Sequence, residues 1–152
     1  MTLRYESEEF SEELKKRLNA SSEFREKAKG MSWKILTVVS DIPFAIFSTY
    51  ADGMLVERKH VPAAEIQAYR EQADFIVEVP TYELSIEMAT GKQSLATLFL
   101  SGKIKVEGSI FKAMKYQGAM EEMSKITAAL ANESVLPSKE EFTQTLRQRG
   151  LL

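Results

Sequence analysis

Residues 94–123 read SLATLFLSGKIKVEGSIFKAMKYQGAMEEM, and this stretch decides the fold. Its first part predicts a helix, because three apolar residues recur at i, i+3 and i+4, the spacing of one helix face. These residues are Leu95, Leu98 and Phe99. Gly102 ends the predicted helix, since glycine accepts the left-handed backbone conformation that follows a helix C-terminus.

A strand and a second helix follow in the same stretch. Charged and apolar residues alternate from 103 to 107, which predicts a half-buried strand with Ile104 and Val106 facing inward. Ser109 is expected to cap the next helix, which we expect to continue to Leu130. That helix is apolar on more than one side, so protein or ligand must cover it. Its large apolar residues are Ile110, Phe111, Met114, Met120 and Met123.

Composition sets the broad class. The chain has 152 residues, of which 44% are hydrophobic and 28% charged, values typical of one globular domain over residues 1–152. The net charge of −2 argues against a general nucleic-acid binder. No cysteine is present, which excludes disulfides and thiolate chemistry. We expect a cytoplasmic protein, because no apolar run reaches the length of a membrane span and the first residues are polar and acidic.

The remaining segments predict an α/β (α+β) fold with five strands in one sheet. N-terminal helices are expected over 8–29, a helix at 82–90, and a helical tail over 133–152 that begins with the capping box of Ser138 and Glu141. Strands are expected at 33–40, 44–50, 54–60, 74–79 and 103–107. Consecutive hairpins make most of the pairing antiparallel, and helices must cover at least one face of the sheet.

Strand periodicity indicates which side chains share a face. Phe44, Ile46 and Tyr50 alternate onto one side of the second strand, and Phe75 and Val77 onto one side of the fourth. Asp-Gly at 52–53 predicts a tight hairpin turn. The charged residues of strand 54–60 suggest one solvated face or a sheet edge, and 61–65 is expected to be a connection that could contain one helical turn.

No catalytic or metal-binding constellation is present in the sequence. His60 is the only histidine, which excludes a histidine metal cluster, and its place at a strand end predicts an ordinary surface or edge residue. No Gly-x-Ser-x-Gly and no phosphate-binding glycine loop occurs. We therefore expect no catalytic residue, no metal and no cofactor; an enzyme that uses carboxylates and His60 is the least favoured class.

The apolar residues of the central helices are the remaining candidates for function. Methionine is flexible and polarisable, and it is common at surfaces that accept varied apolar partners. Composition alone favours an ordinary packed core as the role of the same residues. Nearby charge leaves two interpretations open as well. Four lysines and one glutamate between residues 100 and 116 would suit an anionic head group or a brief contact with an anionic membrane, or they form a solvated face.

The run LFLSGKIKVEG over residues 98–108 resembles the signature of the sterol carrier protein type 2 family, in which a helix leads into Gly-Lys-(Leu/Ile)-Lys-(Val/Ile)-x-Gly-(Asp/Asn). The strand 74–79, Gly91 and the hairpin at 52–53 match family features in the same order, so the resemblance covers about residues 32–126. Ser109 stands where the family often has Asp or Asn, and all three are good N-caps.

The resemblance implies a five-stranded sheet covered by helices around an apolar tunnel that holds a fatty acid, acyl-CoA or sterol-like lipid. It implies binding and carriage rather than catalysis. The local lysines add a possible transient membrane contact as partner, and the net charge of −2 predicts no nucleic-acid partner. An accessory protein-interaction module with a filled core is the alternative. The residues predicted to bind the ligand are Phe44, Ile46, Phe75, Val77, Leu84, Met88, Leu95, Phe99, Phe111, Met114, Met120 and Met123. The sequence does not predict an oligomeric state.

Overall fold

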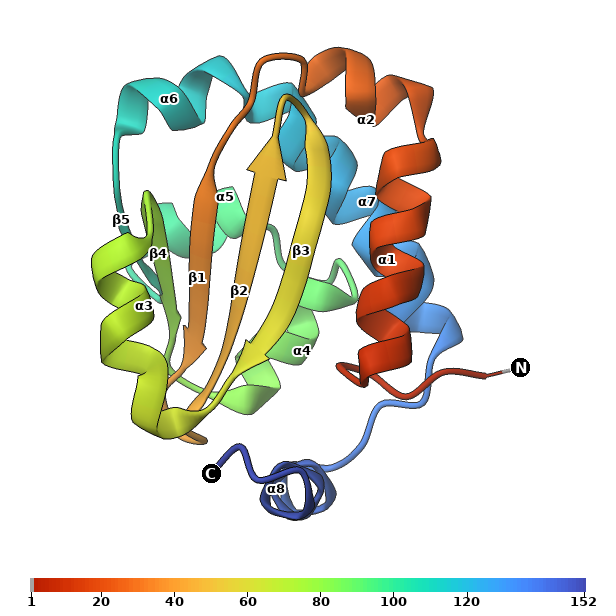
Figure 1. Ribbon diagram of the computed structural model, residues 1–152, viewed down its shortest axis with the longest axis vertical. Helices are drawn as coiled ribbons and strands as arrows, with labels where there is room; N and C mark the ends of the chain where they lie inside the picture. Colours follow the sequence, from red (N-terminus) through yellow and green to blue (C-terminus); the bar gives the residue numbers. More distant parts are fainter. Residues whose placement is uncertain (1) are drawn as a thin grey trace.

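The computed structural model describes residues 2–152. Its centre is a five-stranded sheet in the order β3-β2-β1-β4-β5 (Figure 1). The strands are β1 (Lys34–Val39), β2 (Phe44–Ala51), β3 (Met54–Val61), β4 (Phe75–Val79) and β5 (Lys105–Glu107). Only β1 and β4 pair in parallel, and the other three pairings described are antiparallel. The predicted sheet, mostly antiparallel with helices around it, is confirmed.

Helices cover the two faces of the sheet unequally. They are α1 (Glu8–Ala20), α2 (Ser22–Lys27), the short η1 (Ala63–Glu65), α3 (Ile66–Gln72), α4 (Tyr82–Ala89), α5 (Leu95–Leu100), α6 (Ile110–Lys115), α7 (Gln117–Glu133) and α8 (Lys139–Gln148). One face carries the main core with α1, α2, α4, α7 and α8. On the other face, Ile66 and Tyr69 of α3 pack against a smaller cluster. No helix within residues 2–152 is both long and apolar enough to cross a membrane.

Several local predictions are confirmed by caps and turns. Ser109 accepts a hydrogen bond from the Lys112 amide, and the capping box of Ser138 and Glu141 is formed in both directions. At the β2–β3 turn the φ angles of residues 52 and 53 are both positive, at 48° and 78°. That conformation gives the twist that a tight antiparallel hairpin needs, which is why an Asp-Gly pair predicts it.

Three details differ from the sequence predictions. The helix expected to run unbroken from 110 to 130 divides at Tyr116, whose buried ring packs edge-on against Trp33 at 5.3 Å. The connection after β3 contains η1 and then the full helix α3, which covers the smaller sheet face. A bulge between Thr49 and Tyr50 interrupts the β2–β3 ladder and shifts the alternation of β3 by one residue.

Candidate functional site

The central stretch builds an apolar cluster between the sheet and helices α4 and α5, called here the α4–α5 cluster. Its buried members are Val77, Val79, Leu98 and Ile104. Its partly buried members are Ile35, Leu84, Met88, Leu95 and Val106. Four of the twelve predicted ligand-binding residues meet here: Val77 from β4, Leu84 and Met88 from α4, and Leu95 from α5. In Figure 1, both helices lie behind the sheet.

Backbone conformation fixes the edge of this cluster. The β5–α6 junction turns at Gly108, where φ is +138°. A Cβ atom at Gly108 would lie 2.4 Å from Cδ1 of Phe75 and 2.7 Å from the carbonyl oxygen of Asp74. Only glycine therefore lets β5 pack this closely against β4. Ile104, just before β5, is buried in the α4–α5 cluster as the alternation predicts.

Five of the predicted residues lie in or against the main core instead. Phe44 packs edge-on against Phe142 at 5.0 Å, and Phe75 packs against Trp33 at 4.6 Å. Ile46 is buried in the same core. Met120 and Met123 of α7 pack against it and remain partly buried. Ile35 touches both this core and the α4–α5 cluster, so the apolar interior is continuous across the sheet face.

The last three predicted residues are exposed. Phe99 lies on α5, and Phe111 and Met114 lie on α6, so the structure does not bring them together with the α4–α5 cluster. Leu98 is the only buried residue of α5, and α6 has none. These two helices therefore have few buried side chains to fix their positions.

Two depressions are described on the surface, and both are open to solvent. One, of about 480 Å³, is lined by Leu84, Lys103, Glu83 and Glu87 together with Pro80 and Thr81. Leu84 belongs both to this depression and to the α4–α5 cluster. Leu84 is therefore the residue through which the depression borders the α4–α5 cluster, and Lys103 is the one basic residue that lines it. The enclosed tunnel implied by the family resemblance stays a prediction.

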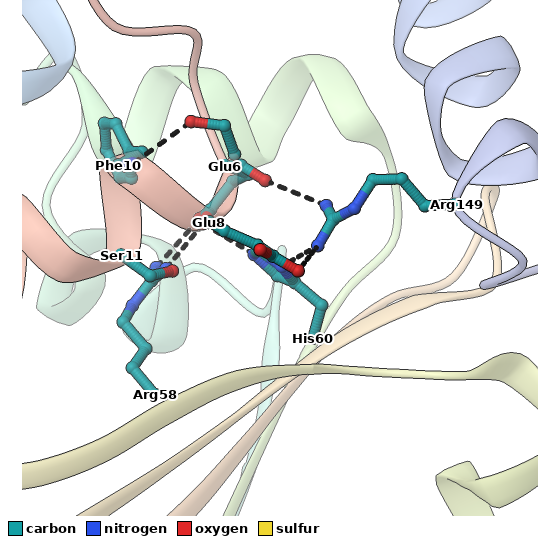
Figure 2. A network of polar contacts seen from close by, with 8 residues as sticks. Glu6, Glu8, Phe10, Ser11, Arg58, His60 and Arg149 are labelled. Atoms are coloured by element: carbon teal, nitrogen blue, oxygen red, sulfur yellow. Dashed lines mark hydrogen bonds and ion pairs between the residues drawn. The ribbon is translucent and has the colours of Figure 1, made fainter.

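A buried polar network lies toward the β3 edge of the sheet, where the N-terminal segment, β3 and α8 meet (Figure 2). Both guanidinium nitrogens of Arg58 donate to the carboxylate of Glu6, at 2.6 and 2.8 Å. Arg58 also donates to Ser11 of α1 at 2.7 Å. His60 Nε2 lies 3.4 Å from Glu6 Oε1, and its Nδ1 lies 2.9 Å from Nη2 of Arg149.

This network corrects part of two sequence predictions. β3 is an edge strand, as one of the two interpretations of its charges had it, and His60 lies on that strand, but Arg58 and His60 face inward and not toward solvent. Because of the bulge, Leu55 and Arg58 both face α1, and the His60 side chain is only 4% exposed. Since arginine can only donate, His60 Nδ1 must accept from Arg149, and its Nε2–H then points to Glu6. No pattern in the sequence near His60 indicates partners that lie 54 and 89 residues away.

The electrostatics of the network follow from burial and charge. Burial by itself would raise the pKa of Glu6, but the charge and hydrogen bonds of Arg58, with a further bond from His60, lower that pKa to about 2. Burial would lower the pKa of Arg58, yet Glu6 raises it. Glu6 and Arg58 are therefore a paired ionic contact, whose role in this structure is to join chain segments.

Within residues 2–152, no group of three or more His, Asp or Glu side chains is placed to hold a metal ion. The site residues that sequence reasoning left out of its binding set are apolar members of the α4–α5 cluster, above all Val79, Leu98 and Ile104. Strand alternation and helix spacing mark each of these as inward-facing. Only their meeting at one place required the tertiary structure.

Comparisons with known proteins are consistent with this geometry. The model of the SCP-2 sterol transfer family matches residues 12–121. A crystal structure of sterol carrier protein 2 superposes with a TM-score of 0.67 at 20% identity, covering 80% of this chain and 95% of that one. The solution structure of a conserved hypothetical protein from Thermus thermophilus, described as a candidate sterol carrier protein, superposes with a TM-score of 0.68 at 20% identity, covering 87% and 91%.

A sec-alkyl sulfatase also contains a similar segment, with a TM-score of 0.51 and 24% identity over 72% of this chain but only 15% of the sulfatase chain. At these identities the structural likeness shows the fold alone. A sequence search of curated proteins finds no significant match.

Proposed function

The chain belongs to the SCP-2 sterol transfer family, and from that premise we propose that it binds an apolar lipid between its sheet and helices α4 and α5 and carries it without chemical change. The supporting observation is the α4–α5 cluster. Its members Leu84, Met88, Leu95 and Val106 are apolar and only partly buried, and one of them, Leu84, also lines a surface depression.

The ligand class follows from this chemistry. Each CH₂ group that leaves water contributes about 0.8 kcal/mol, so a long acyl chain or a sterol needs few polar contacts to bind. Lys103 at the rim of the depression can pair with an anionic head group such as a carboxylate or a phosphate. We therefore propose a fatty acid, an acyl-CoA or a sterol-like lipid as ligand. We also propose that the chain forms a single domain and acts in the cytoplasm.

Binding requires the interior to open. The side chains of the α4–α5 cluster pack against one another, so we propose that a ligand displaces part of this packing. Helix α5 is held by Leu98 as its one buried residue, so it can move away from the sheet at less cost than the longer helices of the main core. We propose that the ligand enters beside Leu84 and lifts α5.

The test is to purify the protein, extract it with organic solvent and analyse the extract by mass spectrometry, and then to titrate delipidated protein with a fluorescent fatty acid. We expect a co-purifying lipid and displacement of the probe at micromolar concentrations. Absence of both results would refute the proposal. It would favour the alternative, an accessory protein-interaction module, for which the mutual packing of the α4–α5 cluster is the supporting observation.

A further inference from the structure

Helix α6 carries its large apolar residues on the outside of the protein. Phe111 is 87% exposed, Met114 66% and Ile110 64%. At about 100° per residue these three side chains occupy one continuous arc of the helix. Ala113, on the other side, is the residue that packs toward the main core. An exposed apolar face of this kind marks a surface that meets another apolar phase.

Charge next to this face indicates the chemistry of its partner. Lys112 and Lys115 continue the same arc, and Lys103 and Lys105 lie on the segment that leads into α6. All four lysines are exposed, and none forms an ion pair within the part of the chain that the structure describes. The whole chain is acidic, with a net charge of −2, so this positive region is local.

We propose that α6 is the surface on which the protein docks to an anionic lipid membrane. Ile110, Phe111 and Met114 insert among the acyl chains near the head groups, and Lys112 and Lys115 contact the lipid phosphates. Lys115 also lies over the Tyr116 ring at 5.4 Å, at the junction that anchors α6 to the core. The proposal names the surface at which a carried lipid would pass to or from a membrane. It rests on the proposed carriage function only for the purpose of docking, since the docking itself is argued from α6.

A second copy of the chain fits this surface less well. In a twofold dimer each α6 would face its own equivalent, so the unpaired lysines of one copy would lie near those of the other. An anionic membrane instead supplies both the apolar layer and the negative charge that complement this surface.

The experiment is flotation of delipidated protein with vesicles of phosphatidylcholine, either alone or with about 30% phosphatidylglycerol. We expect binding to the anionic vesicles only, and weaker binding as salt rises above about 0.15 M. Phe111→Ser combined with Met114→Ser should reduce vesicle binding by roughly tenfold or more. Lys112→Gln combined with Lys115→Gln should reduce it by on the order of tenfold and weaken its salt dependence.

Matched controls come from the rest of the surface. The charge control is Lys16→Gln combined with Lys34→Gln, which changes the net charge as much as the α6 lysine variant does, at two exposed lysines without ion pairs. The apolar control is Val56→Ser, which removes a side chain that is 47% exposed on β3, at the other edge of the sheet. Both controls should float like the wild type. Circular dichroism should show all variants folded, since no buried residue is changed.

Failure to float with anionic vesicles, or flotation that the α6 variants leave unchanged, overturns the proposal. Sedimentation could instead show a concentration-dependent dimer that Phe111→Ser abolishes, with no vesicle binding. That result would assign the surface to a second copy of the chain and would also overturn the proposal. Vesicle binding and fatty-acid displacement are separate measurements, so docking can fail while lipid binding stands, and the reverse.

Discussion

Glu6 joins three separate parts of the chain through one residue. It is 3% exposed, and its carboxylate accepts hydrogen bonds from Arg58 on β3 while its backbone carbonyl accepts from Arg149 beyond α8. Its backbone is in the left-handed region, with φ of 56°, which costs a non-glycine residue about 1 kcal/mol. The ion pair and its neighbours hold that conformation in place.

Replacing Glu6 by glutamine should destabilise the fold by about 3 kcal/mol at neutral pH, because Arg58 would remain buried without a counter-charge. The folded-state pKa of Glu6, about 2, lies below its ordinary value of 4.5. The stability that the carboxylate supplies is therefore complete above about pH 4.5 and lost as pH falls toward 2. Urea unfolding at several pH values should show wild type and Glu6→Gln converging at low pH. The exposed partner of Arg17 provides the control, since Glu133→Gln should change stability far less.

A constant difference in unfolding free energy between wild type and Glu6→Gln from about pH 6 down to about pH 2.5 would contradict the depressed pKa.

Gly102 and Gly108 require glycine for different reasons, backbone conformation alone at Gly102 and backbone conformation together with close packing at Gly108. Gly102 has φ of +75° with open space around it, so Gly102→Ala should cost about 1 kcal/mol from backbone strain alone. Gly108→Ala would in addition force its Cβ against Phe75, so it should cost at least about 2 kcal/mol more. Chemical denaturation of the two variants measures the difference. Equal costs would show that β5 moves away from Phe75 easily.

At the scale of elements, the helices around the sheet differ in how many side chains hold them. α1 buries Phe10, Leu14 and Leu18, and α7 buries Ala119, Leu130 and Ala131 among others. α5 and α6 flank β5. α5 buries one residue and α6 buries none. The free energy that holds an element in place scales with the apolar area it buries, so opening of the fold should begin at α5 and α6.

Amide hydrogen exchange should show this order. We expect backbone amides of α5 and α6 to exchange at least about tenfold faster than those of α1 and α7, because local opening exposes them without global unfolding. Addition of a bound fatty acid should slow exchange in α5 if that helix closes over the ligand. Mass spectrometry of peptic fragments measures both effects. Protection of α5 equal to that of α1 would argue against opening at this place.

At the scale of the whole molecule, the sheet separates two apolar regions. The main face holds the aromatic core and the α4–α5 cluster, which Ile35 connects. The other face holds a small cluster of six buried residues closed by α3. Arg70 of α3 pairs with Glu78 of β4, which adds a polar contact at that cover. Of the two described regions, the main face therefore has the larger apolar interior for a lipid chain.

Substitution on the two faces should therefore separate stability from binding. Met88→Ser removes about three CH₂ or equivalent groups from the α4–α5 cluster and should weaken fatty-acid binding roughly tenfold or more. Ile66→Ser removes a similar partly buried side chain from the other face. Ile66→Ser should lower the melting temperature about as much as Met88→Ser does, while it leaves the affinity for the fatty acid unchanged. Fluorescence displacement and thermal unfolding measure the two quantities on the same samples. Loss of affinity in Ile66→Ser would show that the binding assay reports stability instead.

Much of the fold follows from local chemistry that a sequence displays. Ser109 and Ser138 cap helices as predicted because the cap needs only a hydroxyl and the amides two or three residues later. Alternation correctly placed Phe75 and Val77 on one side of β4 because the strand period is two. Alternation was misleading in β3, where a bulge shifted the period and turned Arg58 inward.

Local sequence patterns specified most of the elements, the resemblance to the family and the apolar character of the central stretch, since caps, glycine turns and periodicity act over a few residues. They missed helix α3 and the break at Tyr116. The tertiary structure decided which of those apolar residues meet. It brought Val77, Leu84, Met88 and Leu95 together, placed Phe44 and Phe75 in the aromatic core, and left Phe111 outside. It also paired Glu6 with Arg58, 52 residues away. Contacts between distant segments depend on how whole elements pack, and no local pattern records that packing.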